Sequence, residues 1–129
     1  MVAQAVTPYL LYENADKAID FLTRGFGFRE VERSTGQAGG VHAELEVRPS
    51  GARVYVGAPG GDFRGPGKVG QTALVYVMVD DVNAHYEKAK AAGARIVEEL
   101  VDLPYGDRRY GCEDSQGHLW TFASPIARE

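Results

Sequence analysis

The sequence predicts an α+β domain made of two copies of a β-α-β-β-β unit, whose strands form a curved mixed sheet around a cavity, with the helices on its outer face. Two stretches carry this prediction, LLYENADKAIDFLTRGFGFREVE at residues 10–32 and YVMVDDVNAHYEKAKAAGARIVEE at residues 76–99. They share the order of strand, helix cap, helix, glycine and strand. We therefore expect one domain over residues 1–129, with repeat one at about 5–58, a Gly/Pro-rich linker at 58–70 and repeat two at about 71–125.

Turn residues and periodicity set the elements of the first copy. A short apolar run predicts a strand over residues 7–12, and Asn14 is placed to cap a helix over 15–24 that Gly25 and Gly27 end. Strands are expected over residues 28–34, 41–47 and 53–57. The middle one alternates strictly between apolar and polar side chains, which is typical of a strand with one buried face.

The second copy repeats this order. We expect a strand over residues 73–79, a cap at Asp80 or Asp81, a helix that ends before Gly93, and a strand over 94–100. The last two strands, 110–114 and 118–123, flank the turn sequence SQG and form a hairpin.

Composition limits the classes of partner. The net charge of -4 is spread along the chain, which argues against a nucleic-acid partner and weakly favours neutral or cationic small molecules. No apolar run approaches the length of a membrane span, so no membrane partner is expected. Cys112 is the only cysteine, which excludes an internal disulfide and fits a cytoplasmic location. Cys112 could be a nucleophile, but the sequence shows no histidine paired with it that would activate the thiol.

A duplicated β-α-β-β-β unit with a DxxGH turn at residues 114–118 resembles the glyoxalase/bleomycin-resistance (vicinal oxygen chelate) superfamily. Its most specific parts are YENADKAIDFL with the following GF, and PYGDRRYGCEDSQGHLWTFAS. The resemblance implies two repeats whose sheets curve around a cavity, often completed by a second subunit. Members of this superfamily include metal-dependent lyases and isomerases, extradiol dioxygenases, fosfomycin-modifying enzymes and metal-free drug-binding proteins.

The resemblance also implies where metal ligands would lie. In the metal enzymes they come from the first and last strands of each repeat, which here gives Thr7, Tyr55, Leu74 and Thr121. None of these is a histidine, carboxylate or thiolate, whereas a transition-metal site wants at least three such ligands. We therefore expect neither a metal nor another cofactor.

Several side chains are candidates for contact with a ligand. Side chains alternate between the two faces of a strand, so Tyr9, Tyr55, Tyr76 and Met78 are expected on the same face as the four ligand positions. There they either line an aromatic pocket or fill the core. Thr121 belongs to the same set. His42 and Glu44 lie two residues apart on one strand face, where they could be solvated, bind a polar or cationic ligand, or hold a displaced metal.

The turn around Tyr105 is the least core-like stretch. Tyr105, Arg108 and Arg109 could grip an anion or stack on a ring at the mouth of the cavity. Alternatively, Asp107 pairs with one of the arginines and fixes the turn. His118 is expected to make a structural hydrogen bond, and His85 to lie exposed or half-buried on its helix.

These observations favour a metal-independent protein of the bleomycin-resistance type that sequesters an amphipathic or aromatic, cationic or neutral small molecule. The alternative is a lyase, isomerase or dioxygenase of the same superfamily that uses His42 and Glu44 with a displaced metal. An enzyme without a cofactor, using tyrosine or arginine for acid-base chemistry, is a third possibility. Curved sheets leave open edges, so a homodimer is expected.

Overall fold

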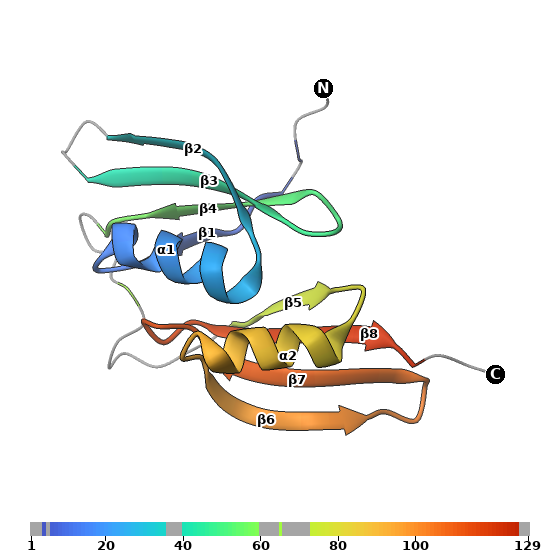
Figure 1. Cartoon of the computed structure of the whole chain (residues 1–129). Coiled ribbons are helices and arrows are strands. Elements are labelled where there is room, and N and C mark those ends of the chain that lie inside the picture. Colours follow the sequence, from blue (N-terminus) through green and yellow to red (C-terminus); the bar gives the residue numbers. More distant parts are fainter. Residues whose placement is uncertain (1–3, 5, 36–39, 60–64, 66–72, 127–129) are drawn as a thin grey trace.

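The computed structural model describes residues 4, 6–35, 40–59, 65 and 73–126, which form two β-α-β-β-β modules (Figure 1). The predicted α+β class and the repeated order of elements are confirmed. Most of the expected linker, 58–70, lies outside the described residues. Module one consists of β1 Tyr9–Leu11, α1 Ala15–Phe26, β2 Arg29–Thr35, β3 Val41–Val47 and β4 Ala52–Gly57. Module two consists of β5 Val75–Met78, α2 Val82–Ala91, β6 Arg95–Asp102, β7 Asp107–Glu113 and β8 Leu119–Pro125.

Each module has its own four-stranded mixed sheet, with the orders β1-β4-β3-β2 and β5-β8-β7-β6. In each sheet the first strand runs parallel to the last, and the other neighbours are antiparallel. Tyr9 lies opposite Tyr55 in module one, and Tyr76 lies opposite Thr121 in module two. The two modules therefore share one register, which supports the residue equivalences expected from the sequence.

The helix caps lie where the sequence predicts them. The side chains of Asn14 and Asp81 accept hydrogen bonds from backbone amides three residues later, at 3.1 Å in both helices. The prediction that α1 ends at residue 24 is wrong, because Gly25 lies inside the helix. A Cβ atom at Gly25 would lie 3.1 Å from the Cβ of Ala92, so glycine there allows α2 to approach closely. Gly27, with φ of 77°, ends the helix.

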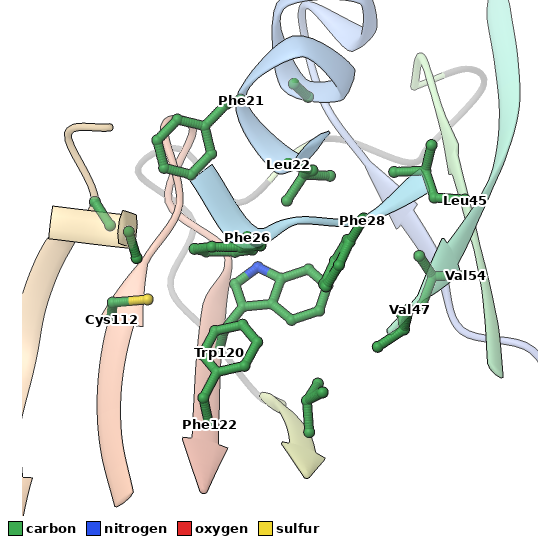
Figure 2. Close-up of a cluster of buried hydrophobic side chains, with 14 of the residues drawn as sticks. Phe21, Leu22, Phe26, Phe28, Leu45, Val47, Val54, Cys112, Trp120 and Phe122 are labelled. Carbon is green, nitrogen blue, oxygen red and sulfur yellow. The ribbon is translucent and has the colours of Figure 1, made fainter. Parts of the chain in front are cut away.

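One aromatic cluster joins the two modules. The indole of Trp120 packs between Phe26 and Phe28, with ring centroids 5.5 and 5.3 Å away, and Phe122 lies beside it (Figure 2). Each helix covers one face of its own sheet, and the two helices lie against each other (Figure 1). Full burial of a large apolar side chain contributes about 1.5–3 kcal/mol, so this shared core stabilises the pairing of the modules. No helix among the described residues is long and apolar enough to cross a membrane.

A buried carboxylate also connects the modules. Asp114, in the turn between β7 and β8, is 5% exposed. Its Oδ2 atom accepts hydrogen bonds from the hydroxyl of Tyr12 and, at 3.0 Å, from the indole nitrogen of Trp120. Its Oδ1 atom accepts from the backbone amides of Gln116 and His118 at 3.0 and 3.1 Å. The charge is thereby compensated by four donors, as burial of a carboxylate requires.

The same turn makes further hydrogen bonds to module one. The Nε2 atom of His118 lies 2.7 Å from the carbonyl oxygen of Leu11, which confirms the predicted structural role of this histidine. The side-chain amide of Gln116 accepts from the backbone amide of Asn14 and donates to its carbonyl oxygen, at 3.0 and 2.7 Å. The DSQGH turn therefore holds module one and module two together.

Candidate functional site

Each sheet has one face covered by its helix and one open face. The apolar residues predicted to share the parity of the ligand positions lie on the open faces, where Tyr9, Leu74, Tyr76 and Met78 are between 45% and 52% exposed. The alternative that these side chains fill the core is wrong for the single chain, because the core lies on the opposite faces of the sheets.

The open face of module one carries three aromatic rings in mutual contact. The hydroxyl of Tyr9 lies 2.8 Å from Nδ1 of His42, and Tyr55 packs edge-on against both, with centroid distances of 5.8 and 5.3 Å. Gly57 lies under the ring of Tyr9, where a Cβ atom would come within 2.6 Å of the hydroxyl. Glu44 is 3.9 Å from the guanidinium of Arg53, a long and partly exposed ion pair.

The open face of module two contains a hollow of about 340 Å³, a volume in the range typical of small-molecule sites. Its apolar side chains are Leu74, Val97 and Leu119, and Gly111 and Trp120 also border it. Its polar groups are Tyr76, Glu98, Arg109 and Thr121. Gly111, at the middle of strand β7, is itself buried. A Cβ atom there would meet the side chains of Val97 and Glu98 at 3.5 Å, so these two side chains cover the backbone at this point.

The two consecutive arginines point to opposite sides of the sheet. β7 begins at Asp107, earlier than the predicted start at residue 110, so Arg108 and Arg109 are strand residues and alternate between its faces. Arg108 lies on the helix side and donates to Asp102 and Asn83. Its predicted place beside Arg109 at the cavity mouth is therefore wrong. The alternative of an Asp107–arginine pair is also wrong, since both arginines bind other carboxylates.

Arg109 and Glu98 form a bidentate ion pair in the hollow. Its Nε and Nη2 atoms donate to the two carboxylate oxygens at 2.8 and 3.3 Å. This hydrogen bonding raises the pKa of Arg109 above its ordinary value. Tyr105 is 63% exposed and is not among the residues that line the hollow. Partial burial raises the pKa of Tyr76, and the neighbouring Tyr105 adds to the shift.

Two other reactive groups, His85 and Cys112, lie away from the open faces of the sheets. His85 places Nδ1 2.6 Å from the hydroxyl of Tyr110 and Nε2 3.1 Å from the carbonyl oxygen of Phe26, and burial lowers its pKa to about 4. His85 is half-buried on the same helix face as Val82 and Ala89, which agrees with its predicted position. Cys112 is buried, and burial raises its thiol pKa to about 12, so it is a poor nucleophile at neutral pH.

A second, shallower hollow of about 590 Å³ lies between the modules and is rimmed by charged groups. Most of these groups already have partners. Glu46 pairs with Arg29 and Arg48, and Asp81 caps α2. The hollow on module two, with apolar side chains and a few convergent polar groups, is the better candidate for a ligand site.

The fold and the open faces together define a paired-module α+β protein with a hollow on one open sheet face. A protein-family model matches residues 4–122, and the chain belongs to the Glyoxalase/Bleomycin resistance protein/Dioxygenase superfamily. Uncharacterized proteins of Mycobacterium bovis and Mycobacterium tuberculosis are 32% identical over 130 residues, which cover 97% of this chain and 86% and 76% of theirs.

Comparison with solved structures also finds proteins with the same fold. TioX from Micromonospora sp. ML1 is 35% identical with a TM-score of 0.75, over 98% of this chain and 99% of that chain. The fold alone is shared with TnmS3, an antibiotic binding protein from Streptomyces sp. CB03234, at 16% identity and a TM-score of 0.74, over 97% and 99% of the two chains. It is also shared with the fosfomycin resistance protein FosX from Listeria monocytogenes, at 14% identity and a TM-score of 0.66, over 99% and 94% of the chains.

Proposed function

We propose that this protein binds an aromatic or amphipathic small molecule on its open sheet faces without a metal, in the manner of bleomycin-resistance proteins. The observation that carries the proposal is the hollow on module two. It combines apolar side chains with the hydroxyls of Tyr76 and Thr121 and the charged pair Glu98–Arg109. Such a mixture suits a flat ring system with a few polar substituents.

The donor chemistry of the open faces supports the metal-free part of the proposal. Tyr55 and Thr121 hold equivalent last-strand positions, where the metal enzymes of the superfamily supply a ligand. Neither they nor Thr7 and Leu74 provide a carboxylate, imidazole or thiolate. Among the residues that the structure describes, no group of three or more His, Cys, Asp or Glu side chains could hold a metal ion. These residues do not fit a transition metal.

The alternative, a metal enzyme built on His42 and Glu44, finds less support in the geometry. His42 has one ring nitrogen bound to Tyr9, and Glu44 lies beside Arg53. Elemental analysis of protein purified without chelator tests this directly. One transition-metal ion per chain, lost in His42→Ala and retained in His118→Ala, would overturn the metal-free proposal.

We also propose that the protein is a homodimer whose subunits cover each other's open faces. The exposed side chains Tyr9, Leu74, Tyr76 and Met78 are large and apolar, and an exposed apolar sheet face of this kind favours association. Sedimentation velocity at micromolar concentration should give the mass of two chains. A single species of 14.0 kDa would refute the dimer.

Ligand binding is tested by calorimetric titration of chelator-treated protein with a bleomycin-type drug and with unrelated aromatic antibiotics. Saturable heat at a fixed stoichiometry, unchanged by added EDTA, is the expected result. Absence of saturable binding across the whole panel would refute the binding function, whereas binding that requires added metal would favour the enzyme alternative.

A further inference from the structure

We propose that the Glu98–Arg109 pair selects a flat aromatic ligand bearing a neutral group that both donates and accepts hydrogen bonds, such as an aryl carboxamide or lactam. This inference rests on the proposed binding function and narrows its ligand class. It follows from three features of the module-two hollow: its apolar lining, the way its two charges are paired, and the other charges on the same face.

The lining of the hollow places apolar side chains beside the charged pair. Gly111 lies at the centre of β7, opposite Thr121 on β8 and opposite Glu98 on β6. The aliphatic walls formed by Leu74 and Val97 flank this point. A ring held against Leu74 and Val97 would therefore bring its edge substituent to the Glu98–Arg109 pair.

The pair leaves donors and acceptors side by side. Arg109 uses two of its five N–H groups on Glu98, so three donors remain. The carboxylate of Glu98 accepts two bonds and retains about two lone-pair sites. A carboxamide matches this arrangement, since its carbonyl oxygen can accept from Arg109 while its N–H donates to Glu98.

A charged ligand would have to disturb the pair. An aryl carboxylate would compete with Glu98 for Arg109 and leave two carboxylates close together. An arylmethylammonium ion would compete with Arg109 for Glu98 and leave two cations close together. A neutral amide lets both charges keep their partner, and the cost of leaving a charge uncompensated rises as the ligand excludes water. The pair therefore discriminates against both signs of charge.

Other charges on the open face of module two bear on this argument. Glu113 lies two residues beyond Gly111 and is paired with Arg95 at 2.9 Å. Asp107 lies two residues before Arg109 on the same strand face and contributes to the raised pKa of Tyr76. Asp107 is not among the residues that line the hollow, but its charge favours cations, so the test includes a cation.

The test compares three probes that share one ring system and differ in charge: 2-naphthamide, 2-naphthoate and 2-naphthylmethylammonium. Equilibrium dialysis at pH 7 against the intact protein gives three dissociation constants. We expect the carboxamide to bind about tenfold more tightly than either ion, since hydrogen bonds to charged groups carry discrimination of this size.

Two variants should switch this order. Glu98→Gln leaves Arg109 without its carboxylate, so naphthoate should become the tightest of the three probes. Arg109→Gln leaves Glu98 uncompensated, so the ammonium probe should become the tightest. Arg108→Gln is the matched control, because Arg108 lies on the helix side and binds Asp102. It should leave the order unchanged. The Glu98–Arg109 pair is partly exposed, so both variants should keep the wild-type unfolding temperature within a few degrees.

A further variant tests the lining of the hollow independently of charge. A Cβ atom at Gly111 would meet the side chains of Val97 and Glu98 at 3.5 Å, so Gly111→Ala should fold normally while its methyl group takes up part of the volume of the hollow. All three probes should then bind several-fold more weakly, with the same order of preference.

The outcomes separate the two proposals. Probe binding whose order the Glu98→Gln and Arg109→Gln variants do not change would overturn the selection by the pair and leave the binding function standing. Preference of the wild-type protein for the ammonium probe would also overturn it. Failure of every probe to bind the wild-type protein up to millimolar concentration would overturn both the inference and a binding site in this hollow.

Discussion

Replacing Asp114 with asparagine tests how strongly the turn between β7 and β8 holds the two modules together. The buried carboxylate accepts from Tyr12 and Trp120 on one oxygen and from the amides of Gln116 and His118 on the other. An asparagine has nearly the same shape but only one accepting oxygen. In either orientation of its side-chain amide, two donors therefore face an NH₂ group.

The loss of stability can be estimated from the hydrogen-bond donors that face residue 114. If the asparagine oxygen faces the backbone amides, the indole N–H of Trp120, which can only donate, is left buried and unsatisfied. The hydroxyl of Tyr12 can rotate and accept instead. An unsatisfied buried donor costs about 1–3 kcal/mol, and the lost bond to a charged acceptor adds to this. We expect Asp114→Asn to lower the free energy of unfolding by about 2–4 kcal/mol, a large fraction of the typical 5–15 kcal/mol.

Urea unfolding followed by the fluorescence of the single tryptophan, Trp120, measures this change. Tyr12→Phe should cost less, about 1–2 kcal/mol, because it removes one donor and leaves three on the carboxylate. Asp80→Asn, at an exposed aspartate, is the control and should change stability by less than about 0.5 kcal/mol. A loss below about 1 kcal/mol for Asp114→Asn would show that the carboxylate is not the main tie between the modules.

Three further predictions concern groups inside the chain. The folded pKa of His85, about 4, lies below its ordinary value of 6.5, so the unfolded state binds more protons between these pH values and stability should fall as pH drops from 6.5 to 4, by about 3 kcal/mol. Urea unfolding as a function of pH, compared with His85→Gln, isolates this slope, and equal slopes would contradict it. Cys112 should react with iodoacetamide at least about a hundredfold more slowly than free cysteine at pH 8, as followed by mass spectrometry, and rapid labelling of folded protein would disprove its burial. Gly57→Ala should displace the ring of Tyr9 and break its contact with His42 at a cost below about 1 kcal/mol, since Tyr9 is half exposed, and an unmoved ring in the crystal structure of the variant would refute this.

The repeated modules could be predicted from the sequence because each depends on local signals. The strict alternation of β3 gave its bounds, residues 41–47, and Asn14 and Asp81 cap their helices through amides three residues away. The equivalence of Tyr55 and Thr121 follows from glycines four residues earlier, and the strand register supports it. Periodicity and turn chemistry act within a few residues, so one sequence carries them in full.

The parts that could not be predicted depend on contacts between distant segments. Asp114 binds Tyr12 across 102 residues, and no local pattern indicates that this aspartate is buried. Gly25 resembled a helix stop, but its role depends on Ala92 of the other module. The orientation of Arg108 and Arg109 follows from where β7 begins, and pairing of Asp107 with Pro125 across the sheet sets that start.

The equivalence of the two modules explains why the described hollow lies on module two. Glu44 lies opposite Tyr55, and Gly111 lies opposite the equivalent residue Thr121, so Glu44 and Gly111 are counterparts. In the same way His42, opposite Gly57, is the counterpart of Arg109, opposite Ala123. Module one places a glutamate and a tyrosine where module two has a glycine and a threonine. The larger pair and the packed ring of Tyr9 occupy the face of module one, whereas the hollow on module two borders the smaller pair, Gly111 and Thr121. The two modules thus share one register but differ in side-chain volume at two equivalent positions, and the hollow lies where that volume is smaller.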